Sequence, residues 1–401
     1  MDIKTIHIGK ELLIRADQKQ RQIGEYLLSC NLDYTDRVGI MDGLAGVGLL
    51  LSMFYRHTND ERYLDRLNQA VDLMNKKIYM GKTTITSYCS GIAGYAWLIV
   101  YLKENDLIEV DLDDYLSDID RVLSQSVMSM IERKEFDQLH GAVGIGFYFL
   151  KRGNMKIVET IIDGLYKNRK NIGGHMTWSY FHNAKNAEIV DFGLAHGIPG
   201  ILYFLHKCYT KKVLTEKCTE IIRESLSFLF NYFNFSGIPS YFPSLIDFDK
   251  IMQHDNQQNS SRLAWCYGDL TLFCVLLQTA QDFPTETDII KTLENVAKRK
   301  SFEETHINDS GFCHGVVGIA QIFHRLYHNT GNTCFEETAK FWLEKTLSVG
   351  NATDGFLGYV YTDNKNKQPL EILVGISGVG LVLLSFLNPE LINWDESLFL
   401  M

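Results

Sequence analysis

The sequence has few of the residues that break or crosslink a chain. It contains 6 prolines in 401 residues, and no Ser- or Gly-rich stretch has the composition of a linker. Its 8 cysteines are too sparse and too irregularly spaced for a disulfide framework in a chain of this length. We therefore expect one reduced, cytoplasmic protein with a single domain over residues 1–401.

Positive charge and long apolar runs are also scarce. Lys and Arg number 39 against 49 Asp and Glu, which gives a net charge of −10, and no basic cluster occurs. This balance argues against a nucleic-acid-binding surface. Residues 1–21 are charged throughout and lack the apolar core of a secretion signal. The apolar runs stop short of the roughly 20 residues that a membrane span needs, so no transmembrane segment is expected.

Glycine, by contrast, is frequent and recurs in a pattern. Seven times a glycine precedes a strongly apolar run, and in six copies a second glycine follows three residues later. The first glycines of the seven copies are Gly43, Gly91, Gly141, Gly197, Gly268, Gly315 and Gly375. In the fifth copy Thr271 stands at the place of the second glycine. Neighbouring copies lie 47 to 71 residues apart, which is enough for two helices and their connections.

Each repeat combines an apolar segment with an amphipathic one. Runs such as 46–55 and 378–387 are apolar on most of their circumference, which is typical of inner, buried helices. Segments such as 60–79, 110–133 and 212–231 carry charge on one face, which is typical of outer helices. The repeat unit is therefore predicted to be a helical hairpin.

Seven such hairpins over residues 41–390, preceded by an N-terminal helical segment at 1–40, predict an all-α fold that closes into an (α/α)7 toroid. An open helical solenoid and a six-hairpin barrel are the alternatives, although a solenoid needs polar terminal repeats that this chain lacks. Segments 176–181, 238–245 and 355–362 are rich in aromatic and β-favouring residues. They predict short strands or ordered loops at the mouth of the toroid.

Residues that can bind a metal stand directly before three of the glycines. Cys266 and Cys313 lie two residues before the glycine of their repeat, and His196 and His314 lie one residue before it. Equivalent positions of a toroid share one rim, so these side chains should converge. Zinc binds thiolate and imidazole tetrahedrally, and three protein ligands leave one position open. Cys266, Cys313 and His314 are predicted to hold one zinc ion per chain; the alternative is two small core cysteines and a helix-capping histidine.

Three motifs resemble those of the lanthionine synthetase C family, the cyclases of lantibiotic biosynthesis. They are Leu194-Ala195-His196-Gly197-Ile198-Pro199-Gly200, Arg262-Leu263-Ala264-Trp265-Cys266-Tyr267-Gly268 and Cys313-His314-Gly315. The resemblance covers about residues 40–390. It implies the (α/α)7 toroid and a zinc ion held by the same two cysteines and histidine.

The resemblance also implies a reaction. Cyclases of this family add cysteine thiols to dehydroalanine or dehydrobutyrine and so form lanthionine or methyllanthionine rings. His196 would protonate the enolate because imidazole titrates near neutral pH. Asp137 would orient or charge that histidine, and Arg262 would stabilise the enolate oxygen. Tyr267 is placed to hydrogen-bond near the metal. Asp137 as a helix cap, Arg262 paired with a surface acid and Tyr267 as packing remain the alternatives.

The implied partners are a dehydrated precursor peptide with its leader and a separate dehydratase, because the chain resembles the stand-alone cyclases. The same resemblance implies a transporter as a further partner and association with a membrane-bound biosynthetic complex. Two other classes stay open. One is a zinc-thiolate enzyme such as a protein prenyltransferase β subunit, which would need a basic cavity. The other is a non-catalytic or glutathione-handling relative that binds peptides and keeps the zinc.

Overall fold

The computed structural model describes residues 6–172, 174–183, 185–252, 261–307, 309–353, 355–362 and 369–400. The chain divides into two compact units, one formed by Met1–Ile119 with Ile307–Met401 and the other by Asp120–His306. The first unit contains repeats one, two, six and seven, and the second contains repeats three, four and five. The assignment of residues 1–401 to one domain stays a prediction.

In the described part of the chain, an inner helix begins one residue after the first glycine of every repeat. These helices are α2 (Leu44–Thr58), α4 (Ile92–Glu104), α7 (Ala142–Arg152), α9 (Ile198–Thr210), α12 (Asp269–Thr279), α15 (Val316–Thr330) and α17 (Ile376–Leu387). In α2 every residue from Leu44 to Phe54 is buried, and in α17 every residue from Ile376 to Phe386. The predicted inner helices are confirmed. None of the described helices combines the length and apolar character that crossing a membrane requires.

Amphipathic outer helices pack against the inner ones. They are α3 (Glu61–Tyr79) on α2, α8 (Met155–Asn168) on α7, α10 (Thr215–Asn231) on α9, α13 (Ile289–Val296) on α12 and α16 (Thr333–Val349) on α15. The short α5 (Leu112–Tyr115) and α6 (Ser117–Arg133) follow α4. Four outer helices begin at a side-chain cap, because Asp60, Asn154, Asp288 and Asn332 each accept a hydrogen bond from a backbone N–H of the first turn. The inner helices begin at glycine instead.

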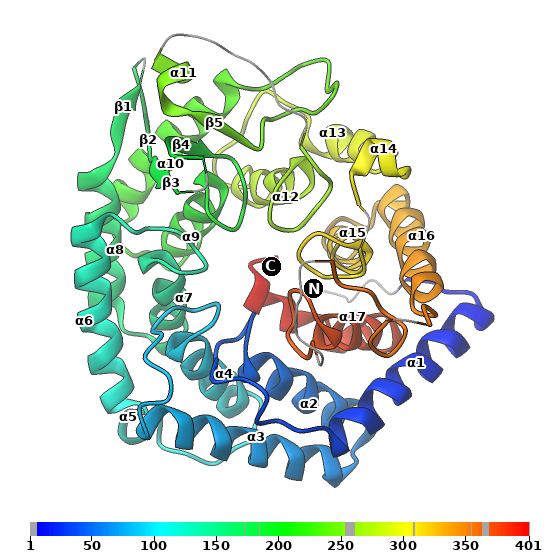
Figure 1. Ribbon diagram of the computed structural model, residues 1–401. Coiled ribbons are helices and arrows are strands. Elements are labelled where there is room, and N and C mark those ends of the chain that lie inside the picture. The colour runs from blue at the N-terminus through cyan, green and yellow to red at the C-terminus, as the bar shows by residue number, and fades with distance from the viewer. Residues whose placement is uncertain are drawn as a thin grey trace. The chain divides into compact units, whose positions relative to one another are not determined.

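The last inner helix takes its outer partner from the other end of the chain. The N-terminal α1 (Lys10–Ser29) packs against α17, and α17 also packs between α15 and α2 (Figure 1). In the first unit the inner helices therefore follow one another as α15, α17, α2 and α4. In the second unit they follow as α7, α9 and α12. The first and last repeats are thus neighbours, as a closed arrangement of repeats requires.

The loops before α2, α4, α7, α15 and α17 share one backbone hydrogen bond. The N–H of the first helical residue donates to the carbonyl oxygen seven residues earlier, as from Leu44 to Arg37 at 3.1 Å and from Ile376 to Pro369 at 2.8 Å. This bond satisfies an N–H that a helix cannot pair internally. It also gives these five loops the same turn, so that their equivalent residues occupy equivalent places.

Backbone hydrogen bonds join neighbouring loops at the residues two places before the repeat glycines. In the first unit these inter-repeat hydrogen bonds run from Cys313 N–H to Leu373 O (2.9 Å), from Leu373 N–H to Met41 O (3.2 Å) and from Met41 N–H to Cys89 O (3.0 Å). In the second unit the same bond runs from Ala195 N–H to Cys266 O at 3.3 Å. The main chain of both candidate cysteine ligands is therefore fixed by contacts between repeats.

Such close contacts exclude side chains at particular places. A Cβ at Gly318 would lie 1.9 Å from the carbonyl oxygen of Phe312. In the fifth repeat, the hydroxyl of Thr271 donates to the carbonyl of Ala264 at 3.5 Å, and Gly268 takes a φ of 112° that favours glycine. The helix α12 nevertheless begins in the same register as the others. The missing second glycine changes the loop but not the start of the helix.

Two small sheets decorate the second unit. The strands β1 (Lys170–Ile172) and β2 (His175–Thr177) form one antiparallel pair, and β2 packs on α10. The strands β3 (Tyr180–His182), β4 (Ala187–Asp191) and β5 (Leu245–Asp247) form the other in that order, followed by α11 (Phe248–Met252). In the first unit, segment 355–362 is a loop with one isolated bridge, Phe356 to Tyr359. Short helices α14 (Phe302–Thr305) and the 3₁₀ helix η1 (Pro389–Leu398) complete the described elements. The predicted short strands and ordered loops are confirmed.

A buried ion pair connects α15, the helix that follows the candidate ligand His314, to η1. The Arg325 guanidinium donates to Asp395 from Nη2 at 2.6 Å and from Nε at 3.0 Å, and Gln321 donates to the same carboxylate at 2.8 Å. The Asp395 side chain is fully buried and that of Arg325 is 6% exposed. Both charges therefore depend on each other for compensation.

Asp395→Ala should destabilise the first unit strongly, because it leaves the Arg325 guanidinium buried without its carboxylate. Breaking a buried pair from one side costs about 3–5 kcal/mol. The measurement is the thermal unfolding midpoint by circular dichroism. Arg21→Ala is the matched control: its partner is Asp17, both side chains are exposed, and the loss should stay within about 1 kcal/mol. Equal shifts for the two variants would contradict the importance given to burial.

Candidate metal centre

Cys266 lies in a loop that is held against the loop of His196. Its side chain is buried, and its carbonyl oxygen accepts the inter-repeat hydrogen bond from Ala195. Gly193 makes this approach possible, because a Cβ there would lie 2.6 Å from the Cys266 oxygen and 2.5 Å from Cδ1 of Tyr267. The sequence places His196 one residue after Ala195. Two segments more than 60 residues apart are thus packed main chain to main chain.

Cys313 and His314 lie in the equivalent loop of the sixth repeat. The N–H of Cys313 donates to Leu373, which fixes the loop against the seventh repeat. The His314 side chain is 11% exposed, and its Nε2 lies 3.2 Å from Oδ2 of Asp309, whose side chain is fully buried. The imidazole and the Asp309 carboxylate therefore lie within ion-pair distance of each other.

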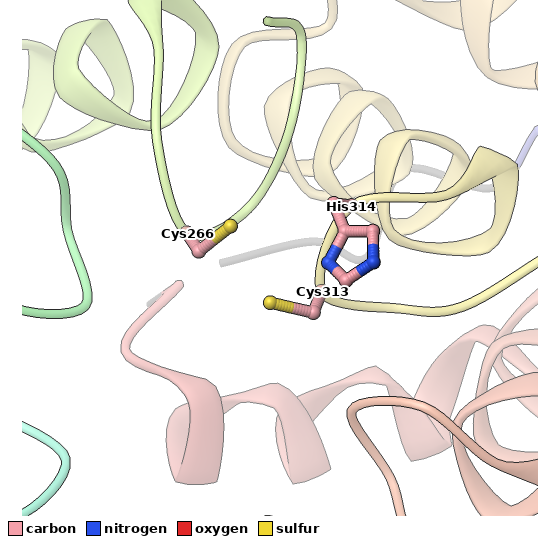
Figure 2. Close-up of side chains that lie close together, drawn as sticks. All are labelled: Cys266, Cys313 and His314. Carbon is pink, nitrogen blue, oxygen red and sulfur yellow. The ribbon is translucent and has the colours of Figure 1, made fainter. Parts of the chain in front are cut away.

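The structure brings the three predicted ligands together. One ligand atom each from Cys266, Cys313 and His314 lies within 4.8 Å of the other two. Figure 2 shows the two sulfur atoms turned toward a common space beside the imidazole ring. Zinc takes thiolate ligands at about 2.3 Å and imidazole at about 2.0–2.1 Å in a tetrahedron. The donor types, their number and their separation fit that ion and leave a fourth position for another ligand.

His196 is paired with Asp137. Nδ1 of the histidine lies 3.5 Å from Oδ1 of the aspartate. The same oxygen accepts hydrogen bonds from the N–H groups of Leu139 at 2.8 Å and His140 at 2.7 Å. Asp137 therefore caps its own loop and contacts His196 at once. The ring of His140 stacks on that of His196 with centroids 6.0 Å apart.

The pairing shifts both groups toward their charged forms. Burial lowers the pKa of His196, but the hydrogen bond and charge of Asp137, with smaller contributions from Asp191 and Cys266, outweigh it and raise the pKa above the usual value. Burial raises the pKa of Asp137, but its bonds to His196 and to the backbone of His140 outweigh burial and lower it. The protonated form of His196 is therefore more stable here than that of an isolated histidine.

The other two predicted site residues differ in exposure. Tyr267 is half-buried, and its ring lies directly against Gly193 beside Cys266. The Arg262 side chain is exposed, and within the described residues its guanidinium forms neither a hydrogen bond nor an ion pair. A Cβ on Gly268 would lie 1.9 Å from the backbone carbonyl oxygen of Arg262. The alternative of Arg262 paired with a surface acid is thus not seen in the described structure.

Sequence reasoning missed Asp191, which lies in the same cavity as His196. A cavity of about 430 Å³ is lined by Asp137 and His196 and also by Tyr180 and Asp191. The Tyr180 hydroxyl donates to Oδ2 of Asp191 at 2.9 Å. Burial raises the pKa of Asp191 to about 6, against the opposing effects of the Gly193 N–H, the charge of His196 and Tyr180. A signal existed: an aspartate stands five residues before both His196 and His314.

Comparisons with known proteins agree with this geometry. The family of lanthionine synthetase C-like proteins matches residues 35–399. The nisin biosynthesis protein NisC of Lactococcus lactis subsp. lactis is 24% identical over 437 aligned residues, which cover 100% of this chain and 96% of that protein. The solved structure of nisin cyclase matches with a TM-score of 0.75 at 20% sequence identity, over 98% of each chain.

The structural likeness confirms the predicted fold class, because nisin cyclase is an α/α toroid. The family match spans nearly the whole chain, including all seven glycine repeats and the three candidate ligands. The protein is therefore a member of the lanthionine synthetase C-like family.

Proposed function

We propose that the protein is a zinc-dependent peptide cyclase. It adds cysteine thiols of a dehydrated precursor peptide to dehydroalanine or dehydrobutyrine and so forms lanthionine and methyllanthionine rings. The observation that carries this proposal is the grouping of Cys266, Cys313 and His314 within 4.8 Å, in a chain of this family. The names of the relatives, a nisin biosynthesis protein and a nisin cyclase, support the same reaction class.

The reaction makes two demands on the site. A C–S bond and a C–H bond form while an S–H bond and the π bond of the dehydroamino acid break, so the mass of the peptide does not change. The thiol must lose its proton, and the enolate formed by the attack must be stabilised and protonated at its α-carbon. Zinc held by Cys266, Cys313 and His314 would supply an open position that favours the thiolate form of the peptide cysteine.

His196 meets the demand for a proton donor. Its Nδ1 faces Asp137, so Nε2 is the nitrogen that delivers the proton to the α-carbon. The raised pKa keeps a larger fraction of the imidazole protonated near neutral pH. Asp137 acts through His196 by holding its ring and compensating its charge.

The remaining residues serve binding and charge. We assign to Arg262, an exposed cation, the stabilisation of the enolate oxygen. Tyr267, packed beside Cys266, forms part of the wall next to the metal. The cavity at His196 is also lined by Trp178, Ile198 and Ile201, which gives an apolar surface for a side chain of the peptide. The substrate would carry its leader and come from a separate dehydratase in the cytoplasm.

The first test combines metal content with thiol consumption. The wild-type protein should hold about one zinc per chain and consume the free thiols of a dehydrated, cysteine-containing precursor peptide, counted by alkylation. Cys266→Ala and Cys313→Ala should each lose the zinc and the activity, because two ligands hold a catalytic zinc poorly. Cys89→Ala is the matched control, since Cys89 occupies the same loop position in the second repeat and lies outside the ligand group.

The outcomes separate the alternatives. Well-folded wild-type protein without zinc would overturn the metal site. Protein that holds zinc yet leaves the thiols of every dehydrated peptide unreacted would favour a non-catalytic or glutathione-handling binding protein. Loss of zinc in Cys89→Ala would show that the loop position, and not the ligand group, decides binding.

His196→Ala should keep the zinc and lower the cyclisation rate by on the order of 10²–10⁴, the usual contribution of a positioned general acid. Rates are measured by thiol alkylation at saturating peptide, and zinc by elemental analysis. His140→Ala, which removes the ring stacked on His196, is the control and should change the rate little. Loss of zinc from His196→Ala would contradict the proton-transfer role.

Asp137→Asn should shift the alkaline limb of the pH–rate profile to lower pH. Asp137 raises the pKa of His196 against the effect of burial, so its removal lets burial prevail and deprotonates the imidazole at lower pH. Activity that needs the imidazolium is full below the pKa of His196 and is lost as the pH rises through it. An unchanged alkaline limb, with the NMR titration of His196 also unchanged, would disprove the pairing.

A further inference from the structure

Two loops of the protein share the pattern Asp-x-Gly-x-x-His-Gly, at residues 191–197 and 309–315. In both, Oδ1 of the aspartate accepts a hydrogen bond from the N–H two residues later, at 2.7 Å in the first loop and 2.6 Å in the second. In both, a Cβ on the final glycine would meet that oxygen, at 2.7 Å and 2.4 Å. The two carboxylates therefore make the same two contacts within their own loops.

The second carboxylate oxygen has different partners in the two loops. Oδ2 of Asp191 accepts from the Tyr180 hydroxyl, and the neighbouring His196 contacts Asp137 instead. Oδ2 of Asp309 accepts from the Thr362 hydroxyl at 2.9 Å and lies 3.2 Å from Nε2 of its own loop's His314. The same carboxylate position thus contacts the histidine only in the loop that carries the candidate metal ligand.

This contact selects one nitrogen of the His314 ring. A neutral imidazole has one N–H donor and one lone pair, and a carboxylate can only accept. Nε2 beside Asp309 therefore carries the hydrogen, and the lone pair resides on Nδ1. Figure 2 shows the two ring nitrogens on opposite sides, one of them toward the sulfur of Cys313. With Nε2 at Asp309, the nitrogen on the sulfur side is Nδ1.

We propose that Asp309 is the positioning residue of the metal centre: when zinc is bound, Asp309 accepts a hydrogen bond from Nε2–H of His314, holds the ring and presents Nδ1 as the metal ligand. The inference rests on the proposed zinc site. A carboxylate on the far nitrogen fixes the tautomer and makes the ligating nitrogen more basic. Thr362 and the Gly311 N–H hold the carboxylate in turn, so the ring is fixed through three connected groups.

The test compares zinc affinities of full-length variants by competition with a chromophoric chelator. Asp309→Asn keeps the size of the side chain but removes the negative charge that accepts from His314, and it should weaken zinc binding by about 10–100-fold. Thr362→Val removes one support of the carboxylate and should weaken it less. Asp191→Asn changes the equivalent carboxylate of the other loop and should leave the affinity for zinc as in the wild type.

Thermal unfolding of the metal-free proteins separates positioning from a general role in folding. A positioning role predicts equal midpoints for metal-free wild type and Asp309→Asn, together with unequal zinc affinities. Equal affinities in these two proteins would overturn the proposal. A loss of zinc affinity in Asp191→Asn as large as that in Asp309→Asn would also overturn it. So would a lowered thermal unfolding midpoint of metal-free Asp309→Asn that accompanies its loss of zinc affinity. Wild-type protein that binds zinc but closes no rings would remove the proposed cyclase activity and leave the Asp309 assignment standing.

Discussion

The loops at the start of the inner helices are tied to one another by main-chain hydrogen bonds, and the rest of the structure depends on this constraint. These loops are buried but not helical, so their N–H and C=O groups must find partners elsewhere. They find them in the loops of neighbouring repeats, as Cys313 does with Leu373 and Leu373 with Met41. Where the backbones of neighbouring loops approach this closely there is no room for a Cβ, which is why a glycine stands in every repeat. The same bonds place the cysteine ligands.

Much of the fold could be predicted from the sequence because buried positions of a helix appear as apolar residues at helical spacing. The inner helices follow the apolar runs after the glycines, and α3 and α10 follow the charged segments closely. The role of α1 could not be predicted, because an amphipathic pattern tells which face is buried but not against what. Its partner α17 lies at the other end of the chain. The division into two units was likewise absent from any local pattern.

Different residues of the candidate site were predicted from different kinds of information. Repeat register placed His196 on the same rim as Cys266, Cys313 and His314, since equivalent positions in a repeat protein converge. The ligand number of zinc and the resemblance to the family then selected the two cysteines and His314. The assignments of Asp137 and Arg262 came from the resemblance to the family and not from spacing. The contact of Asp137 with His196 is now present in the structure, whereas Arg262 remains a prediction. Asp309 was missed because an acidic residue before a helix has the ordinary meaning of a cap. Only the side-chain geometry distinguishes it from Asp191.

The place of α1 has a consequence for synthesis of the chain. Residues 120–306 form a continuous segment, so the second unit can fold as soon as it leaves the ribosome. The first unit cannot, because α1 and α2 are made first but pack on α17, which is made last. The faces of α1 and α2 that pack on α17 therefore stay uncovered until α17 has been made. Contacts of such large sequence separation form slowly, so the packing of α1 and α2 on α17 is expected to be a late step in the folding of the first unit.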